Sequence, residues 1–281
     1  MWPDRINERE AIHLRATFVM LPRVIHDRLD PMRRDIWNVA APSLGGVGTV
    51  IAYGHWGTPV LFFPTEAGSA FDLENNGIIH ALADPLEHGH LKVYAVDSHD
   101  RYTWSDRGLP TEERARRHEG YEAWITDQVV PAIHGDCGGH VGIATAGASL
   151  GAFHAVNITL RRADLFPHAV GLSGNYDPTT WNGWGDIGDA TYFNNPFAYL
   201  RNTQGDHLEW LRHHAFIQLV VGSGAWEVHP TAALPSSRAL AELLGEKGIP
   251  NHLDVWGTDT PHDWPSWARM SAVHIAALGD Y

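Results

Sequence analysis

Short continuous apolar runs alternate along the chain with longer stretches in which apolar residues recur at helical spacing. The run at 59–63 is apolar throughout, as in a strand buried on both faces of a parallel sheet. Further strands are predicted at 92–96, 141–144, 168–172, 216–221 and 253–256. Helices are predicted at 77–88, 111–133, 236–247, directly after Gly151 and at the C-terminus. This alternation is typical of an α/β fold with a mostly parallel central sheet and helices on both faces.

The N-terminal part of the chain has a different pattern. Residues 1–34 show no single regular element, and we treat them as an arm of unknown role. Short β-like pieces at 36–40 and 49–53 are separated by proline and glycine, which predicts antiparallel edge strands. We expect residues 35–281 to form a single domain. Within it, Thr111 is a possible cap for the helix at 111–133, because two glutamates follow it.

An aromatic-rich segment at about 173–202 interrupts the alternation. It carries tryptophan, tyrosine and phenylalanine among many glycine and asparagine residues, which indicates an ordered loop. Loops over the carboxyl ends of parallel strands are where open α/β sheets bind ligands. The segment is therefore either a wall of the substrate site or an insertion that packs on its own aromatic residues.

Charge and composition exclude several classes of partner. The formal net charge of −13 makes a nucleic acid or an anionic membrane an unfavourable partner. No run approaches the roughly 20 apolar residues that cross a bilayer. The first eight residues do not resemble a secretory signal, and the single cysteine, Cys137, excludes an intramolecular disulfide. We therefore expect a cytoplasmic protein that needs no cofactor, and the oligomeric state stays open.

The stretch at 147–151, Gly-Ala-Ser-Leu-Gly, lies between a predicted strand and a predicted helix. A serine at a sharp strand-to-helix turn needs small residues two positions to either side, and here both are glycine. This is the pattern of a nucleophile elbow, so we predict that Ser149 is a catalytic nucleophile. The other interpretation is a structural turn that happens to contain a serine.

A serine nucleophile requires a histidine base and an acid later in the chain. His262 follows the last predicted strand, and Glu227 follows the strand before it, so both reach the edge of the sheet where Ser149 lies. Asp177 is the alternative acid, because it follows the strand at 168–172. His154 and His168 belong to a helix and to a strand start, which are unfavourable places for a mobile base.

A tetrahedral intermediate formed on a serine also needs two N–H donors for its oxyanion. Leu150, directly after the nucleophile, is predicted to provide one backbone donor. The other should come from the loop after 60–63, where Pro64 has no N–H. Glu66 is the first choice there, followed by Thr65 and Ala67.

Together these motifs resemble the putative esterase family, which includes esterase D, feruloyl esterases and the mycolyltransferases. The resemblance rests on Tyr-Gly-His at 53–55, the run at 59–65, Val-Asp-Ser at 96–98, the serine motif at 147–151, Trp-Glu at 226–227 and His-Asp-Trp at 262–264. It implies an α/β-hydrolase fold with Ser149, Glu227 and His262 as nucleophile, acid and base. The loop at 64–69 differs from the His-Gly or Asp-Gly start of many relatives, which leaves the second oxyanion donor open.

The sequence therefore predicts a serine carboxylic-ester hydrolase for a small-molecule ester. The alternatives are an acyltransferase with the same triad and a non-catalytic binding protein on the same scaffold. Trp181, Trp184 and Trp226 are candidate substrate-binding residues, or alternatively residues that only close the core. We predict no metal site, because His-Asp pairs at 99–100 and 262–263 lack a third ligand at a recognisable spacing.

Overall fold

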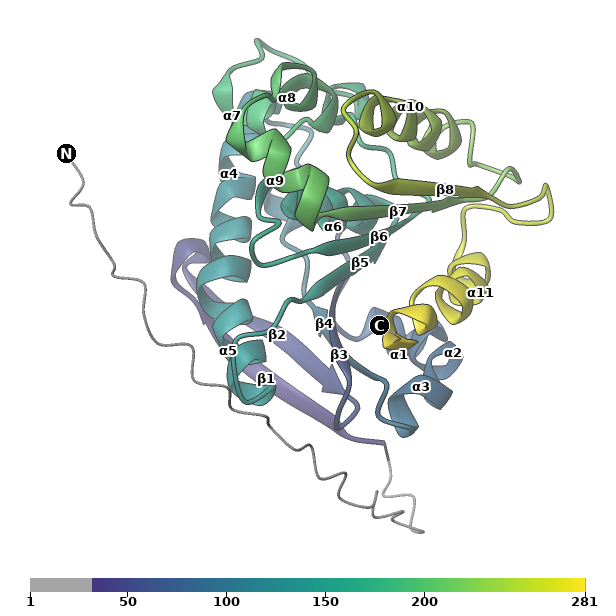
Figure 1. Cartoon of the computed structure of the whole chain (residues 1–281). Helices are drawn as coiled ribbons and strands as arrows, with labels where there is room; N and C mark the ends of the chain where they lie inside the picture. Colours follow the sequence, from purple (N-terminus) through teal and green to yellow (C-terminus); the bar gives the residue numbers. More distant parts are fainter. Residues whose placement is uncertain (1–31, 281) are drawn as a thin grey trace, which may run out of the picture.

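A computed structural model describes residues 32–280 and contains one eight-stranded sheet in the order β1-β2-β4-β3-β5-β6-β7-β8. Helices cover both faces of this strongly twisted sheet (Figure 1). The strands are β1 (Arg34–Ala41), β2 (Gly46–Tyr53), β3 (Thr58–Phe63), β4 (Leu91–Val96), β5 (Ala144–Ala148), β6 (His168–Leu172), β7 (Phe216–Val221) and β8 (Asn251–Val255). The order places β5, which carries the serine motif at its end, near the middle of the sheet.

The pairing is antiparallel at one end of the sheet and parallel over the rest. Strand β2 pairs antiparallel with β1 and β4, and all other neighbours are parallel. The predicted strands at 36–40 and 49–53 are therefore antiparallel, but of these two only the first, β1, lies at an edge of the sheet. Because β3 and β5 to β8 run in the same direction, their carboxyl ends meet at one edge of the sheet.

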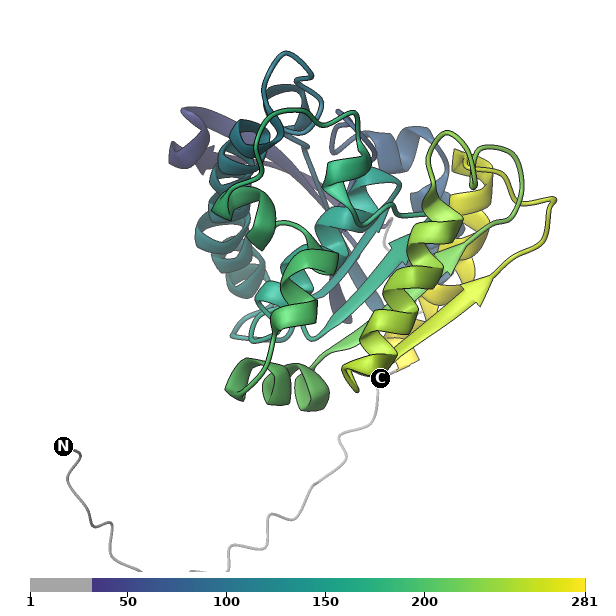
Figure 2. The ribbon, with the colours of Figure 1, turned by 90° about the horizontal axis from the view of Figure 1, so that it is seen from above.

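The helices form two layers, which Figures 1 and 2 show from two directions. One layer contains α1 (Asp72–Asn75), α2 (Ile78–Ala81), α3 (Ala83–Glu87) and α11 (Trp264–His274). The other contains α4 (Thr111–Trp124), α5 (Val130–Asp136), α6 (Leu150–Arg161), α7 (Asp189–Phe193), α8 (Pro196–Asn202), α9 (Asp206–His214) and α10 (Ala233–Glu246). The fold class that the sequence predicts is therefore confirmed.

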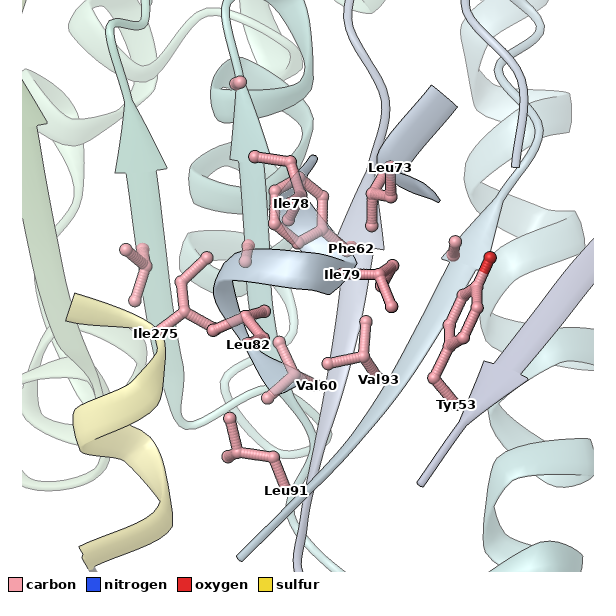
Figure 3. Close-up of a cluster of buried hydrophobic side chains, with 14 of the residues drawn as sticks. Tyr53, Val60, Phe62, Leu73, Ile78, Ile79, Leu82, Leu91, Val93 and Ile275 are labelled. Carbon is pink, nitrogen blue, oxygen red and sulfur yellow. The ribbon is translucent and has the colours of Figure 1, made fainter. Parts of the chain in front are cut away.

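Strand β3 shows why its segment is apolar throughout. Val60 and Phe62 point into the core under α1 to α3 and α11, whereas Leu61 and Phe63 point into the core under α4 to α6. Successive side chains of a strand face opposite sides, so a strand covered on both sides needs apolar residues at every position. Figure 3 shows the first of these cores around Val60 and Phe62.

Several predicted elements differ from those in the structure. The helix at 77–88 is divided into α2 and α3, and the helix at 111–133 is interrupted by a π-helical turn at Ile125–Val129. The Thr111 side chain does not cap α4 and instead donates to the carbonyl oxygen of Trp184. Helix α9 was not predicted.

The strand before the serine motif begins later than the pattern at 141–144 suggests. Strand β5 starts at Ala144 and runs to Ala148, paired with β3 and β6. Its composition of alanine, threonine and glycine carries little strand signal of its own. The neighbouring strands therefore determine where it begins and ends.

The aromatic-rich segment is ordered, with a 3-10 turn at Pro178–Thr180 followed by α7 and α8. The predicted N-terminal arm, apart from 32–34, lies outside the described residues. Within residues 32–280, no helix is long and apolar enough to cross a bilayer.

Candidate active site

Ser149 lies between the end of β5 and the start of α6, with φ 57° and ψ −119°. A positive φ is unfavourable for a residue with a side chain, and here the crowding around the turn holds it. A Cβ on Gly147 would lie 2.1 Å from the carbonyl oxygen of Gly151, and a Cβ on Gly151 would lie 2.3 Å from that of Pro64. Both glycines are therefore required for strand and helix to approach closely.

His262 reaches Ser149 from the loop between β8 and α11. Its Nε2 lies 3.0 Å from the Ser149 hydroxyl oxygen, and its backbone N–H donates to the carbonyl of Ala225. The ring is nearly perpendicular to that of Trp267, with 5.0 Å between ring centroids. The side chain is only 8% exposed, so its position is fixed on several sides.

Glu227 is completely buried and faces the other ring nitrogen of His262. Its Oε2 lies 3.1 Å from Nδ1, and the other carboxylate oxygen accepts the hydroxyl of Ser173 at 2.5 Å and the N–H of Gly222 at 3.3 Å. A buried carboxylate with these donors is suited to orient an imidazole and to stabilise its charged form.

The turn that carries Glu227 packs directly on the loop that carries His262. A Cβ on Gly222 would lie 2.0 Å from the carbonyl oxygen of Thr260, and the N–H of Gly224 donates to that oxygen at 3.0 Å. The glycines of this turn therefore allow the two loops to touch, which fixes the distance between Glu227 and His262.

Ser173 is a residue of the site that the sequence analysis missed. It follows β6 with φ 54° and is fully buried. Its position directly after a predicted strand, at the same edge of the sheet as Ser149, was the available signal. A hydrogen bond from a hydroxyl to a buried carboxylate is strong, because the charge of the acceptor strengthens it.

Asp177, the alternative acid, has a different environment. Its carboxylate accepts the backbone N–H and the hydroxyl of Thr179 and the side-chain amide of Asn195. It thereby caps the 3-10 turn at Pro178–Thr180. These contacts explain Asp177 as a structural residue of the aromatic-rich segment.

The backbone near Ser149 offers two N–H groups in the predicted places. Within residues 32–280, neither Leu150 N–H nor Glu66 N–H has a hydrogen-bond acceptor, whereas Ala67 N–H donates to Asp100. Glu66 and Leu150 line the same cavity as Ser149 and His262. Of the other candidates on the loop, Ala67 N–H is already occupied, and Thr65 N–H also has no acceptor within residues 32–280 but Thr65 does not line the cavity.

The cavity over Ser149 has a volume of about 270 Å³. Trp104 and Trp181 form part of its wall and pack edge to face, with 5.4 Å between ring centroids. Trp184 and Trp226 do not line this cavity. Trp184 is half exposed and donates to the carbonyl of Arg107, and Trp226 is exposed beside the turn of Glu227. The structure therefore brings only Trp181 of the three predicted tryptophans to the site.

Histidine, cysteine, aspartate and glutamate side chains do not gather into a metal site in the described part of the chain. No group of three or more of them has an arrangement that could hold a metal ion.

Comparison with known proteins identifies the family. The family model described as "Putative esterase" matches residues 64–276, which is most of the chain. No curated protein matches the sequence significantly. The resemblance inferred from the motifs is confirmed by the family match.

Solved structures share the fold at low sequence identity. A ferulic acid esterase superposes with a TM-score of 0.65 at 14% identity, covering 89% of this chain and 98% of its own. S-formylglutathione hydrolase (FrmB) from Staphylococcus aureus superposes with a TM-score of 0.63 at 15% identity, and the match covers 90% of this chain and 98% of the hydrolase. MPT51 (FbpC1) from Mycobacterium tuberculosis also superposes with a TM-score of 0.63 at 15% identity, and the match covers 88% of this chain and 97% of MPT51. The chain therefore belongs to the putative esterase family, with the α/β-hydrolase fold, and is a carboxylic-ester hydrolase.

Proposed function

We propose that the protein hydrolyses a small-molecule ester through an acyl-enzyme on Ser149, with His262 as base and Glu227 as acid. The observation that carries this proposal is the continuous line of contacts from Glu227 to His262 and from His262 to Ser149, at 3.1 Å and 3.0 Å. In this relation the histidine can take the proton of the serine hydroxyl, and the carboxylate can orient the histidine and stabilise its charged form.

In the first half of the reaction, the Ser149 oxygen attacks the ester carbonyl while His262 Nε2 accepts the hydroxyl proton. The positive charge that forms on the ring is stabilised by Glu227, whose carboxylate accepts the Nδ1 proton in a hydrogen bond. His262 then gives the proton from Nε2 to the departing alkoxide. The products of this half are the free alcohol and the acyl-enzyme.

The negative charge of the tetrahedral intermediate develops on the former carbonyl oxygen. Leu150 N–H and Glu66 N–H are the donors proposed for it, because both border the cavity and neither has an acceptor within residues 32–280. The loss of one such donor typically costs about 10² to 10³ in rate.

In the second half, His262 removes a proton from water, and the resulting hydroxide attacks the acyl carbon. The intermediate collapses, the Ser149 oxygen takes back the proton from His262, and the carboxylic acid leaves. An alcohol in place of water would make the enzyme an acyltransferase.

The cavity points to a small substrate with a flat apolar part. A volume of about 270 Å³ lies just below the usual range for ligand pockets, which is about 300 to 1,000 Å³. The rings of Trp104 and Trp181 offer an aromatic surface to a planar group. We therefore propose short or aromatic acyl esters as the substrate class.

Turnover of a short-chain aryl ester by the wild type and by Ser149→Ala tests the proposal. The wild type should release the phenol, and the alanine variant should be slower by at least about 10³-fold, because the nucleophile is gone. Equal background rates for both proteins would refute it. The same assay with added alcohols distinguishes hydrolysis, which forms the acid, from transfer, which forms a new ester.

A further inference from the structure

Asp100 is a buried carboxylate that the proposed mechanism does not use. It lies in the 3-10 turn Asp100–Tyr102 after β4 and is 1% exposed. One of its oxygens accepts the N–H of Ala67 at 3.2 Å, and the other lies 2.9 Å from Nε2 of His154. The carboxylate thus connects the loop after β3 with helix α6, which begins directly after Ser149.

The loop that Asp100 holds is the loop of the proposed second oxyanion donor. Ala67 has φ 54°, a conformation that is unfavourable for alanine and persists only where surrounding contacts impose it. The bond to Asp100 fixes the peptide between Glu66 and Ala67. It also occupies the Ala67 N–H and leaves the neighbouring N–H of Glu66 without an acceptor in the described chain.

His154 completes the connection from the side of the nucleophile. It lies on α6, five residues after Ser149, and its ring packs between Phe63 and His118. Its Nδ1 is buried without a hydrogen-bond partner within residues 32–280, which is unfavourable for folding. If this position served only for packing, an apolar ring would be more favourable than histidine. The hydrogen bond between Nε2 and Asp100 is therefore the feature that requires a histidine.

The charge state of Asp100 agrees with this arrangement. Burial by itself would raise the pKa of its carboxyl, but the His154 ring and the Ala67 N–H outweigh burial and hold the pKa below its usual value. The group is therefore an acceptor on both oxygens at neutral pH, as two simultaneous N–H bonds require.

We propose that Asp100 and His154 are positioning residues that hold the second oxyanion donor at a fixed distance from Ser149. Neither side chain lines the cavity, so neither touches substrate. They act through the backbone of residues 66–67, which binds the charge of the intermediate. This inference rests on the proposed function.

Asp100→Ala is the direct test, with Asp97→Ala as the matched control. Asp97 also accepts two backbone N–H groups, from Thr49 and from Ala70 in the same loop, three residues beyond Ala67. Asp100→Ala should lower kcat about 10- to 100-fold, because a displaced donor loses part of the 10² to 10³ that it supplies. KM should change less than about threefold, because the carbonyl oxygen of the bound ester carries little charge.

Two further measurements separate positioning from a general effect on folding. A trifluoromethyl ketone forms a charged tetrahedral adduct on a serine, so its affinity should fall by the same factor as kcat. Asp100→Asn retains one acceptor, for the Ala67 N–H, but loses the acceptor that faces His154 Nε2, so its kcat should lie between those of the wild type and Asp100→Ala. Should the alanine variant fail to fold, His154→Phe keeps a ring in the core but removes the donor, and its kcat should fall at least fivefold.

Three results would overturn the inference. One is a kcat loss no larger than that of Asp97→Ala at equal thermal stability, another is an effect on KM alone, and the third is wild-type kcat in a folded His154→Phe protein. The proposed function fails separately, if Ser149→Ala keeps the wild-type rate. An inactive Ser149→Ala together with a fully active Asp100→Ala would therefore refute only the positioning role.

Discussion

At the scale of single residues, the assignment of the acid depends on what surrounds each carboxylate. Glu227 is buried against His262, whereas Asp177 caps a turn in the aromatic-rich segment. Sequence order favoured Glu227 but left both open, because each follows a strand that ends at the same edge of the sheet. The contacts that distinguish them come from side chains far apart in the sequence, such as Ser173 and Asn195.

Glu227→Gln is expected to lower kcat by about 10³ to 10⁴, because an amide can hold the imidazole in the wrong tautomer and cannot stabilise its charge. Asp177→Asn should stay within about threefold of the wild type. Steady-state kinetics on one aryl ester measures both. A severe loss only in the Asp177 variant would reverse the assignment.

Side-chain contacts also limit how far the site can be predicted from the sequence. Ser149, His262 and Glu227 are adjacent in the structure as the motifs predicted, because each follows a strand of the same parallel sheet. Trp184 and Trp226 were predicted at the site from their loops alone, but the direction of a loop side chain depends on contacts such as the bond from Trp184 to Arg107. The contacts of Ser173 with Glu227 and of Asp100 with His154 become visible only once the fold has placed these partners.

At the scale of elements, the approach of β3, β5 and α6 determines the site. Gly151 contacts the backbone at the end of β3 so closely that a methyl group would lie 2.3 Å and 2.4 Å from the carbonyl oxygens of Pro64 and Phe63. These atoms belong to the backbone and move only if the loop with the proposed oxyanion donor moves too.

Gly151→Ala should therefore destabilise the protein by about 1 to 3 kcal/mol and reduce kcat at least tenfold. Gly245→Ala is the matched control, since no atom lies within 4 Å of a Cβ there and the residue is in the last turn of α10. It should be neutral or stabilising by up to about 1 kcal/mol. Thermal unfolding and steady-state kinetics of both variants test this prediction. Equal stability and equal kcat of the two variants would contradict it.

Elements with a strong apolar signal were predicted well, and those defined by their neighbours were not. The strands at 168–172 and 216–221 coincide with β6 and β7, whose side chains face a core on both sides. Strand β5 consists of small residues and takes its bounds from its pairing with β3 and β6. The π-helical turn at Ile125–Val129 has no sequence signal that we recognise.

At the scale of the whole molecule, burial of ionisable groups makes stability depend on pH. Burial lowers the pKa of His168, at the start of β6, to about 4. In the unfolded chain a histidine has a pKa near 6.5, so the unfolded state binds the proton more tightly. The contribution of neutral His168 to the free energy of unfolding is fully present above about pH 6.5 and is lost as the pH falls to about 4.

His168→Gln should remove this part of the acid sensitivity, which amounts to at most about 3 kcal/mol. Denaturant unfolding at several pH values between 7 and 4 measures it. The same substitution at the exposed His80 of α2 serves as control and should leave the slope unchanged. A wild-type slope in His168→Gln would contradict the prediction.

The central claim, that Ser149 carries the covalent intermediate, is tested most directly by mass spectrometry after reaction with a fluorophosphonate. The Ser149 oxygen should displace fluoride, and one phosphonyl group should appear on the peptide that contains Ser149. His262→Ala should label at least about 100-fold more slowly, since the base is missing, and Ser149→Ala should not label at all. A phosphonyl group on another residue, or equal labelling of Ser149→Ala, would contradict the account.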